Sequence, residues 1–149
     1  LFRIDDDARA VWIFQGMEDM EMKVRIIIEI LGSPVEHVEK VMNDVMSELE
    51  KIEISILKKE VSDPKKVEKF YSSFAEIEFK CNGLEKLLDV CFDFMPSVVE
   101  IIEPEEFRFD PKVLEDFLND LLARLHRNSM VMRNLHAENV LMKKELKRN

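Results

Sequence analysis

The chain has 149 residues, a length that suits one domain or a domain with an appendage. Its hydrophobic content of 46% is sufficient for a globular core, and its formal charge of −9 argues against general binding to nucleic acids or anionic membranes. No apolar run is long enough to span a bilayer or has the layout of a signal peptide, so we expect a cytoplasmic protein.

Residues 1–16 differ from the rest of the chain because no hydrophobic period runs through them. The sequence Phe-Gln-Gly-Met at positions 14–17 resembles the remnant of a tobacco-etch-virus protease site followed by a start methionine. We therefore expect residues 1–16 to be a leader of non-native origin, and the native chain to begin at Met17, Met20 or Met22.

The first regular elements are predicted from residue 24 onward. Val24 to Leu31 is rich in β-branched residues and partly alternates, which predicts a strand. Ser33-Pro34-Val35-Glu36 is typical of a helix start with the serine as N-cap, and apolar residues follow on one helical face as far as position 52. A second strand is predicted over Ile54–Val61, and Asp63-Pro64 then indicates a single helical turn.

The next three elements complete a recognisable order. Ser73–Lys80 alternates as a third strand, Asn82 caps a helix that ends at Pro96, and Val98–Ile102 is a fourth strand. Strand, helix, strand, strand, helix, strand resembles the ferredoxin-like βαββαβ sandwich, so we assign residues 17–109 to an α+β domain of that kind.

A long helix is predicted over residues 110–149, beginning with Asp110 as cap and Pro111 just inside, and extending about 55 Å. Its first half is apolar over a broad face, as in packing on a globular body, and its second half narrows to a seam with spacings of three and four, as in a coiled coil. The interface predicted on this helix comprises Leu121, Leu125, Asn128, Met132, Leu135, Asn139, Met142 and Leu146.

Two asparagines on the seam, Asn128 and Asn139, are typical of positions that fix the register of a coiled coil. Residues 135–146 resemble the end of a leucine zipper, but the preceding stretch lacks the dense basic helix that zipper transcription factors use to bind DNA. The alternative to pairing is a single helix that folds back, or frays beyond Asn139.

The sheet is expected to carry a second interaction surface. In a ferredoxin-like fold both helices cover one face, which leaves Ile27 and Phe74 among the residues of the other. That face is too apolar to remain exposed over its whole area, so we expect the last helix or a second subunit to cover it.

We consider an RNA-binding role because residues 72–79 can be compared with the third-strand signature of RNA-recognition modules. Phe74, Ala75 and Phe79 match that signature. Glu76, however, occupies the position of the central stacking aromatic, and its carboxylate would repel phosphate. The sequence therefore argues against RNA binding.

The fold order also resembles that of ACT-type regulatory domains, which implies a small ligand near the loop at residues 31–34. No phosphate loop, nucleophile elbow or zinc-ligand spacing is present, and Cys81 and Cys91 suit core positions. We therefore expect no catalytic residue, metal or cofactor.

These observations predict a non-enzymatic interaction or assembly protein. We expect it to self-associate as a homodimer through its C-terminal helix and sheet face, or to pair with a helix of another protein. The alternative is an ACT-like small-ligand regulatory domain.

Overall fold

The computed structural model describes residues 2–4, 10–12, 20–107 and 110–147. The chain separates into two compact units, Leu1–Phe109 and Asp110–Asn149. Near the start of the first unit, β1 (Phe2–Ile4) and β2 (Ala10–Trp12) form a two-stranded antiparallel pair. The protease-site resemblance at positions 14–17 lies outside the described residues.

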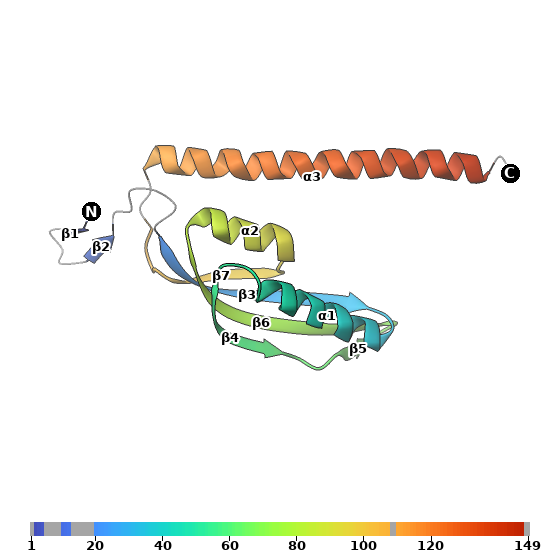
Figure 1. Ribbon diagram of the computed structural model, residues 1–149, viewed down its shortest axis with the longest axis horizontal. Coiled ribbons are helices and arrows are strands. Elements are labelled where there is room, and N and C mark those ends of the chain that lie inside the picture. The colour runs from blue at the N-terminus through green and yellow to red at the C-terminus, as the bar shows by residue number, and fades with distance from the viewer. Residues whose placement is uncertain (1, 5–9, 13–19, 108–109, 148–149) are drawn as a thin grey trace. The chain divides into compact units, whose positions relative to one another are not determined.

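The first unit is built on an antiparallel sheet with the strand order β4-β6-β3-β7, and the short β5 also pairs with β6 (Figure 1). The central strands β3 (Glu21–Gly32) and β6 (Phe70–Asn82) pair along their whole length. One edge is formed by β4 (Ser55–Val61) followed by β5 (Lys65–Val67), and the other by β7 (Val98–Glu103).

Two helices cross over between these strands: α1 (Val35–Leu49) joins β3 to β4, and α2 (Leu84–Phe94) joins β6 to β7. The predicted α+β class and the ferredoxin-like order of elements are therefore confirmed.

The core lies between the sheet and these two helices. Along most of β3 and β6, buried residues alternate with partly buried or exposed ones, as expected for strands with one face in the core. α1 and α2 pack their apolar faces against the buried set, so both cover the same face of the sheet (Figure 1). The core cluster consists of Met20, Met22, Val24, Ile26, Ile28, Met42, Met46, Leu49, Ala75, Ile77, Phe79, Cys81, Leu87 and Val90.

The predicted side-chain caps of α1 and α2 were wrong. Pro34 is the N-cap of α1 and Gly83 that of α2, and neither helix has a side-chain cap hydrogen bond. Gly83 has a φ of 80°, a conformation that glycine adopts without the steric cost of a Cβ, and its N–H donates to the carbonyl of Met20 over 2.8 Å. Asn82 therefore remains the last residue of β6 instead of capping the helix.

The helical turn predicted at Asp63-Pro64 was also wrong. The chain there continues to the short strand β5, in which Val67 pairs with Phe70 across a two-residue connection. Glu68 in this connection has a φ of 53°, so a non-glycine residue occupies the left-handed region.

The second unit is the helix α3 (Pro111–Leu146), which has 36 residues and a length of about 54 Å. Its predicted cap is confirmed, because the Asp110 carboxylate accepts a hydrogen bond of 2.9 Å from the backbone N–H of Lys112, with Pro111 at the first helical position.

Candidate interaction surfaces

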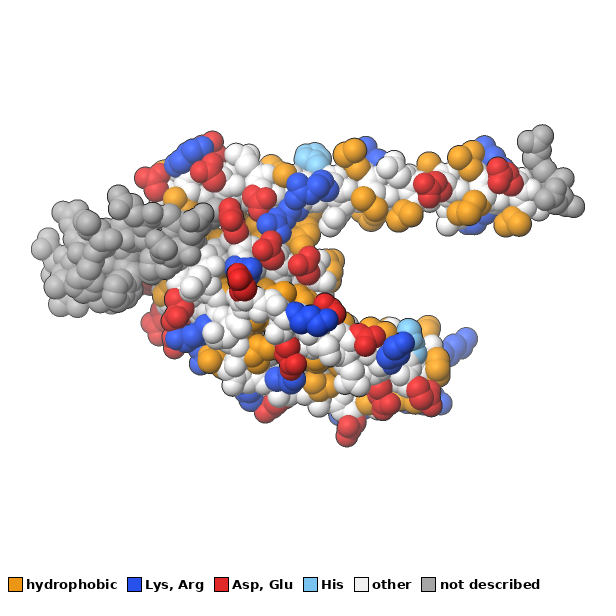
Figure 2. Space-filling view, in the orientation of Figure 1, with side chains coloured by type: hydrophobic (Ala, Val, Ile, Leu, Met, Phe, Trp, Pro, Cys, Tyr) orange, Lys and Arg blue, Asp and Glu red, His pale blue; other side chains and the backbone are white. Residues whose placement is uncertain are grey.

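Most of the exposed large hydrophobic side chains in the described part of the chain lie on α3. No described residue of this helix is buried, and every described residue from Met130 onward is exposed. In Figure 2 hydrophobic side chains recur along the C-terminal part of the helix. Among the seam residues, Leu125 is 49% exposed, Met132 65%, Leu135 59%, Met142 54% and Leu146 78%.

The other predicted residues of the helix also lie on this surface. Asn128 and Asn139 are exposed, and Leu121 is partly buried. With spacings of three and four residues throughout, the predicted set follows one continuous face of a regular α-helix.

The seam is longer than the sequence interpretation recognised. Leu114 and Leu118 continue the spacing of three and four upstream of Leu121, and they are 47% and 45% exposed. We use the name "α3 seam" for the ten residues in this series: Leu114, Leu118, Leu121, Leu125, Asn128, Met132, Leu135, Asn139, Met142 and Leu146. The same periodicity was visible in the sequence, but the broader apolar stripe around these two leucines obscured it.

Ion pairs within α3 are local. Lys112 lies 2.8 Å from Asp116, and Arg124 lies 2.9 Å from Asp120, in each case one helical turn apart. The hydrogen bonds that Lys112 donates to Asp116 and Glu115 raise the pKa of Lys112. Such pairs one turn apart support the helix by a few tenths of a kcal/mol each.

The face of the sheet opposite α1 and α2, which we call the uncovered face, has a charged centre. Arg25 on β3 lies 2.9 Å from Glu78 on β6 and 3.0 Å from Glu100 on β7, and its Nε lies 3.6 Å from Glu76. The three strands are adjacent, and Arg25 stands directly opposite both Glu78 and Glu100 in the pairing register. One guanidinium thus connects three strands of the sheet.

The arrangement perturbs the titration of these groups. The hydrogen bond from Arg25 lowers the pKa of Glu78, and the same bond raises the pKa of Arg25. At the β4 edge, the hydrogen bond that Lys58 donates to Glu60 raises the pKa of Lys58, which lies 3.8 Å from Glu76. The centre of this face is therefore charged, and cross-strand pairs neutralise the charges there.

The two predicted sheet residues lie toward one end of this face. Ile27 on β3 is partly buried and stands opposite Val98 on β7, while Phe74 on β6 stands opposite Glu29 and is 42% exposed. Val98 is 48% exposed. Ile27 and Phe74 are thus diagonal neighbours across β3 and β6, so the structure brings these two residues together.

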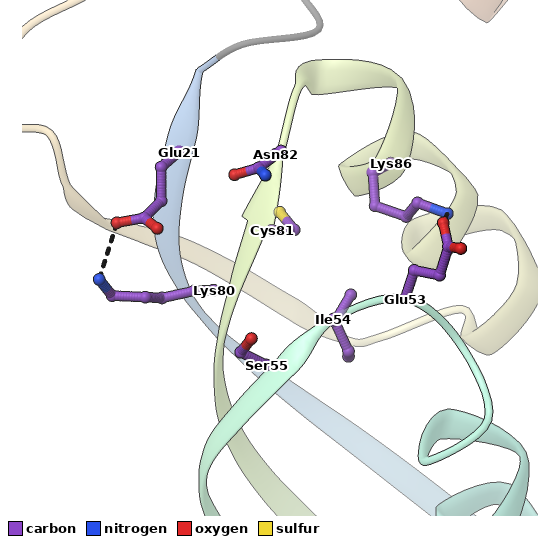
Figure 3. Close-up of a pocket in the computed structure, with 8 residues that line it drawn as sticks. All are labelled: Glu21, Glu53, Ile54, Ser55, Lys80, Cys81, Asn82 and Lys86. Carbon is purple, nitrogen blue, oxygen red and sulfur yellow. Dashed lines mark hydrogen bonds and ion pairs between the residues drawn. The ribbon is translucent and has the colours of Figure 1, made fainter.

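A polar recess of about 460 Å³ opens at the other end of the sheet, where β3 begins and β6 ends (Figure 3). Glu21 lies 2.7 Å from Lys80, and Glu53 lies 3.8 Å from Lys86, so its charged side chains pair with each other. Its lining residues are Glu21, Glu53, Ile54, Ser55, Lys80, Cys81, Asn82 and Lys86, and they do not include the predicted ligand loop at residues 31–34.

The two cysteines are free thiols, with Cys81 buried and Cys91 partly buried. Burial raises the pKa of Cys81 to about 11 and also raises that of Cys91. Both are therefore protonated thiols at neutral pH, a state that disfavours nucleophilic reactions.

Within the part of the chain that the structure describes, no cluster of three or more His, Cys, Asp or Glu side chains could hold a metal ion. Among the same residues, no helix has both the length and the apolar character needed to cross a membrane.

Fold and surfaces define an α+β protein with ferredoxin-like element order and a C-terminal helix that carries an exposed apolar seam. The chain belongs to the MJ0538 family, whose sequence model matches residues 23–148. No match was found among curated proteins or among solved structures. The family match covers all of α3 and the β4-β6-β3-β7 sheet except the first two residues of β3.

Proposed function

We propose that this protein is a non-enzymatic assembly protein that self-associates through the α3 seam, with the apolar end of the uncovered sheet face as a secondary contact. The observation that carries the proposal is the ten-residue seam, whose apolar members other than Leu121 are 45–78% exposed. Burial of such side chains is the main source of free energy in association.

The spacing of the seam favours a helical partner. Side chains at alternating spacings of three and four return to one side of a helix, and two such helices bury them together as knobs in holes. A globular surface would instead favour a broader stripe. The asparagines support the same interpretation, because a polar residue in a coiled-coil seam restricts register and oligomer number.

The charges of the sheet face argue against nucleic acid as the partner. Glu76 and Glu78 occupy the central strand where an RNA-binding sheet would present stacking aromatics, and Glu78 is held ionised by Arg25. The high pKa of Cys81 and the mutual pairing of charges around the polar recess likewise favour a binding role over catalysis.

The mass of the full chain in solution, measured by light scattering, tests the proposal directly. Leu135→Asp is the variant that should disrupt association. A carboxylate introduced into a paired seam would be buried without a partner, so we expect association to weaken by roughly 100-fold, about 3 kcal/mol. The body should keep its far-UV circular dichroism signal and its unfolding midpoint.

Ala137→Asp is the matched control, because it adds the same charge two residues along, on the side of α3 away from the seam. We expect this variant to associate like the wild-type chain. A Leu135→Asp variant that stayed dimeric at low micromolar concentration would count against the seam.

A chain that ends at Arg127 separates the two contacts. A monomer would assign association to the C-terminal half of the seam, and a dimer would move the interface to the sheet face and the first half of α3. If the full chain itself is a monomer, self-association is refuted and the seam becomes a docking surface for a helix of another protein.

Small-ligand regulation is a second candidate, favoured by the polar recess between Glu21 and Lys86. A thermal-shift screen against amino acids and nucleotides tests this candidate, because a ligand that binds only the folded state raises its stability. Loss of a positive shift in a Lys80→Met variant would assign binding to the recess.

A further inference from the structure

We propose that α3 pairs with α3 of a second copy in parallel and in register, so that each seam residue meets its own counterpart. This inference rests on the proposed self-association and specifies its geometry. In heptad notation Leu118, Leu125, Met132, Asn139 and Leu146 take position a, and Leu114, Leu121, Asn128, Leu135 and Met142 take position d.

The asparagines restrict the registers that are available. A seam asparagine opposite a leucine leaves its amide buried without a partner, whereas two facing asparagines can hydrogen-bond to each other. In parallel, in-register pairing Asn128 meets Asn128 and Asn139 meets Asn139. In antiparallel pairing only one register avoids the mismatch, the one in which Asn128 faces Asn139 of the second copy.

The parallel arrangement pairs a longer part of the seam. All ten seam positions from Leu114 to Leu146 find a counterpart when two identical helices run side by side in register. The antiparallel register that matches the asparagines places Leu121 opposite Leu146, so Leu114 and Leu118 extend beyond the paired segment. Both of these leucines are about half exposed and would remain so.

The residues that flank the seam distinguish the two orientations more sharply. In a parallel pair, position g of one helix lies next to position e of the following heptad in the other. Phe117 then meets Leu122, and Glu138 meets Lys143, so an apolar side chain faces an apolar one and an acid faces a base.

In the antiparallel register the flanking contacts become g to g and e to e. Val131 would then lie beside Glu138, and Leu122 beside Lys143, and each contact sets an apolar side chain against a charge. Only Arg124 beside Glu145 is complementary in that orientation. The flanking charges and apolar residues are therefore arranged for parallel helices.

Disulfide cross-linking of the full chain tests the orientation. In a parallel pair a Met142→Cys variant places two thiols face to face at a d position. In the antiparallel register the same thiols are about 17 residues, or roughly 25 Å, apart along the axis. We expect mild oxidation to convert most of the Met142→Cys chain into a disulfide-linked species of twice the mass on a non-reducing gel.

Two controls set the background. The wild-type chain gives the cross-linking yield of its two native cysteines, which are buried or partly buried. Lys144→Cys places a thiol two residues away on the outward side of the helix, where we expect only background cross-linking. Equal yields from Met142→Cys and Lys144→Cys would overturn the proposal, because random collision treats both sides of the helix alike.

The remaining outcomes separate this inference from the proposed function. If light scattering shows a dimer but Met142→Cys cross-links only with a Leu125→Cys chain carrying a mass tag, the helices are antiparallel and self-association stands. If light scattering shows a monomer, both proposals fail together.

Discussion

The two units of the chain use the same kinds of apolar residue to opposite effect. In the sheet unit Val24, Ile26 and Phe79 are completely buried, whereas Leu135 and Leu146 of α3 are 59% and 78% exposed. The sheet unit carries enough complementary surface to close its own core, but a single helix cannot bury its own stripe. This difference is the reason why we propose that α3 contacts a further surface.

The charges differ between the units in the same way. Arg25 contacts carboxylates that are 53 and 75 residues distant in sequence, so its ion pairs hold three strands in register. On α3, by comparison, the ion pair of Lys112 with Asp116 joins residues four apart and supports a turn of the helix itself. Arg25 thus connects distant strands of the sheet unit, whereas the Lys112 pair stabilises local structure in α3.

The largest effect on stability is expected from a substitution in the core of the sheet unit. Phe79→Ala removes a fully buried ring and should lower the free energy of unfolding by about 3–5 kcal/mol in urea denaturation. Leu135→Ala truncates an exposed side chain. It should change the free energy of unfolding of the sheet unit by no more than about 0.5 kcal/mol, as expected for a surface substitution. Comparable losses in both variants would show that α3 contributes to the stability of the sheet unit.

An intermediate effect is expected at the seam. Asn139→Leu removes an amide whose burial costs roughly 1–3 kcal/mol, so the associated state should become more resistant to denaturant. It should also lose its preference for one register and oligomer number, visible as mixed species in light scattering. Asn134→Leu, away from the seam, is the control. Unchanged mass and stability in Asn139→Leu would mean that this asparagine does not enter an interface.

The smallest effect is expected on the sheet face, and it depends on pH. Because Arg25 lowers the pKa of Glu78 in the folded state, this ion pair stabilises the fold above about pH 4–5, where a free glutamate titrates, and the contribution is lost as the pH falls through the lowered value. Arg25→Met should therefore lower stability at neutral pH and flatten its decline between about pH 5 and pH 3.

Thermal unfolding measured across this pH range checks the prediction. Lys112→Met, which removes a cation from a local pair on α3, should leave the pH profile of the sheet unit unchanged. A wild-type profile that is already flat between pH 5 and pH 3 would contradict the role assigned to Arg25.

The sequence was sufficient to predict the order of the four longer strands and the three helices, because each was bounded by a local signal, but it did not predict β1, β2 or β5. These signals involve neighbours within a few residues: the alternation in β3 and β6, the proline after α2 and the Asp110 cap of α3. The caps of α1 and α2 could not be predicted in the same way, because the hydrogen bond from Gly83 to Met20 joins residues more than sixty positions apart.

Two further features had no local signal. The connection between β5 and β6 has Glu68 with positive φ in place of the glycine or asparagine that normally marks such a turn. The charged centre of the sheet face depends on Arg25 standing opposite Glu78 and Glu100, and this requires the register of strands that are distant in sequence. On α3, by contrast, the spacing alone located the exposed seam, while its partner remains a proposal.

The edges of the sheet bear on how the protein behaves when crowded. β4 carries Lys58 and Lys59 next to an irregularity in its pairing, and β7 is a six-residue strand with Glu100 and Glu103. Charged, short and irregular edges are poor templates for a strand from another molecule. The backbone hydrogen-bonding groups at the sheet edges therefore offer little opportunity for fibril-like stacking.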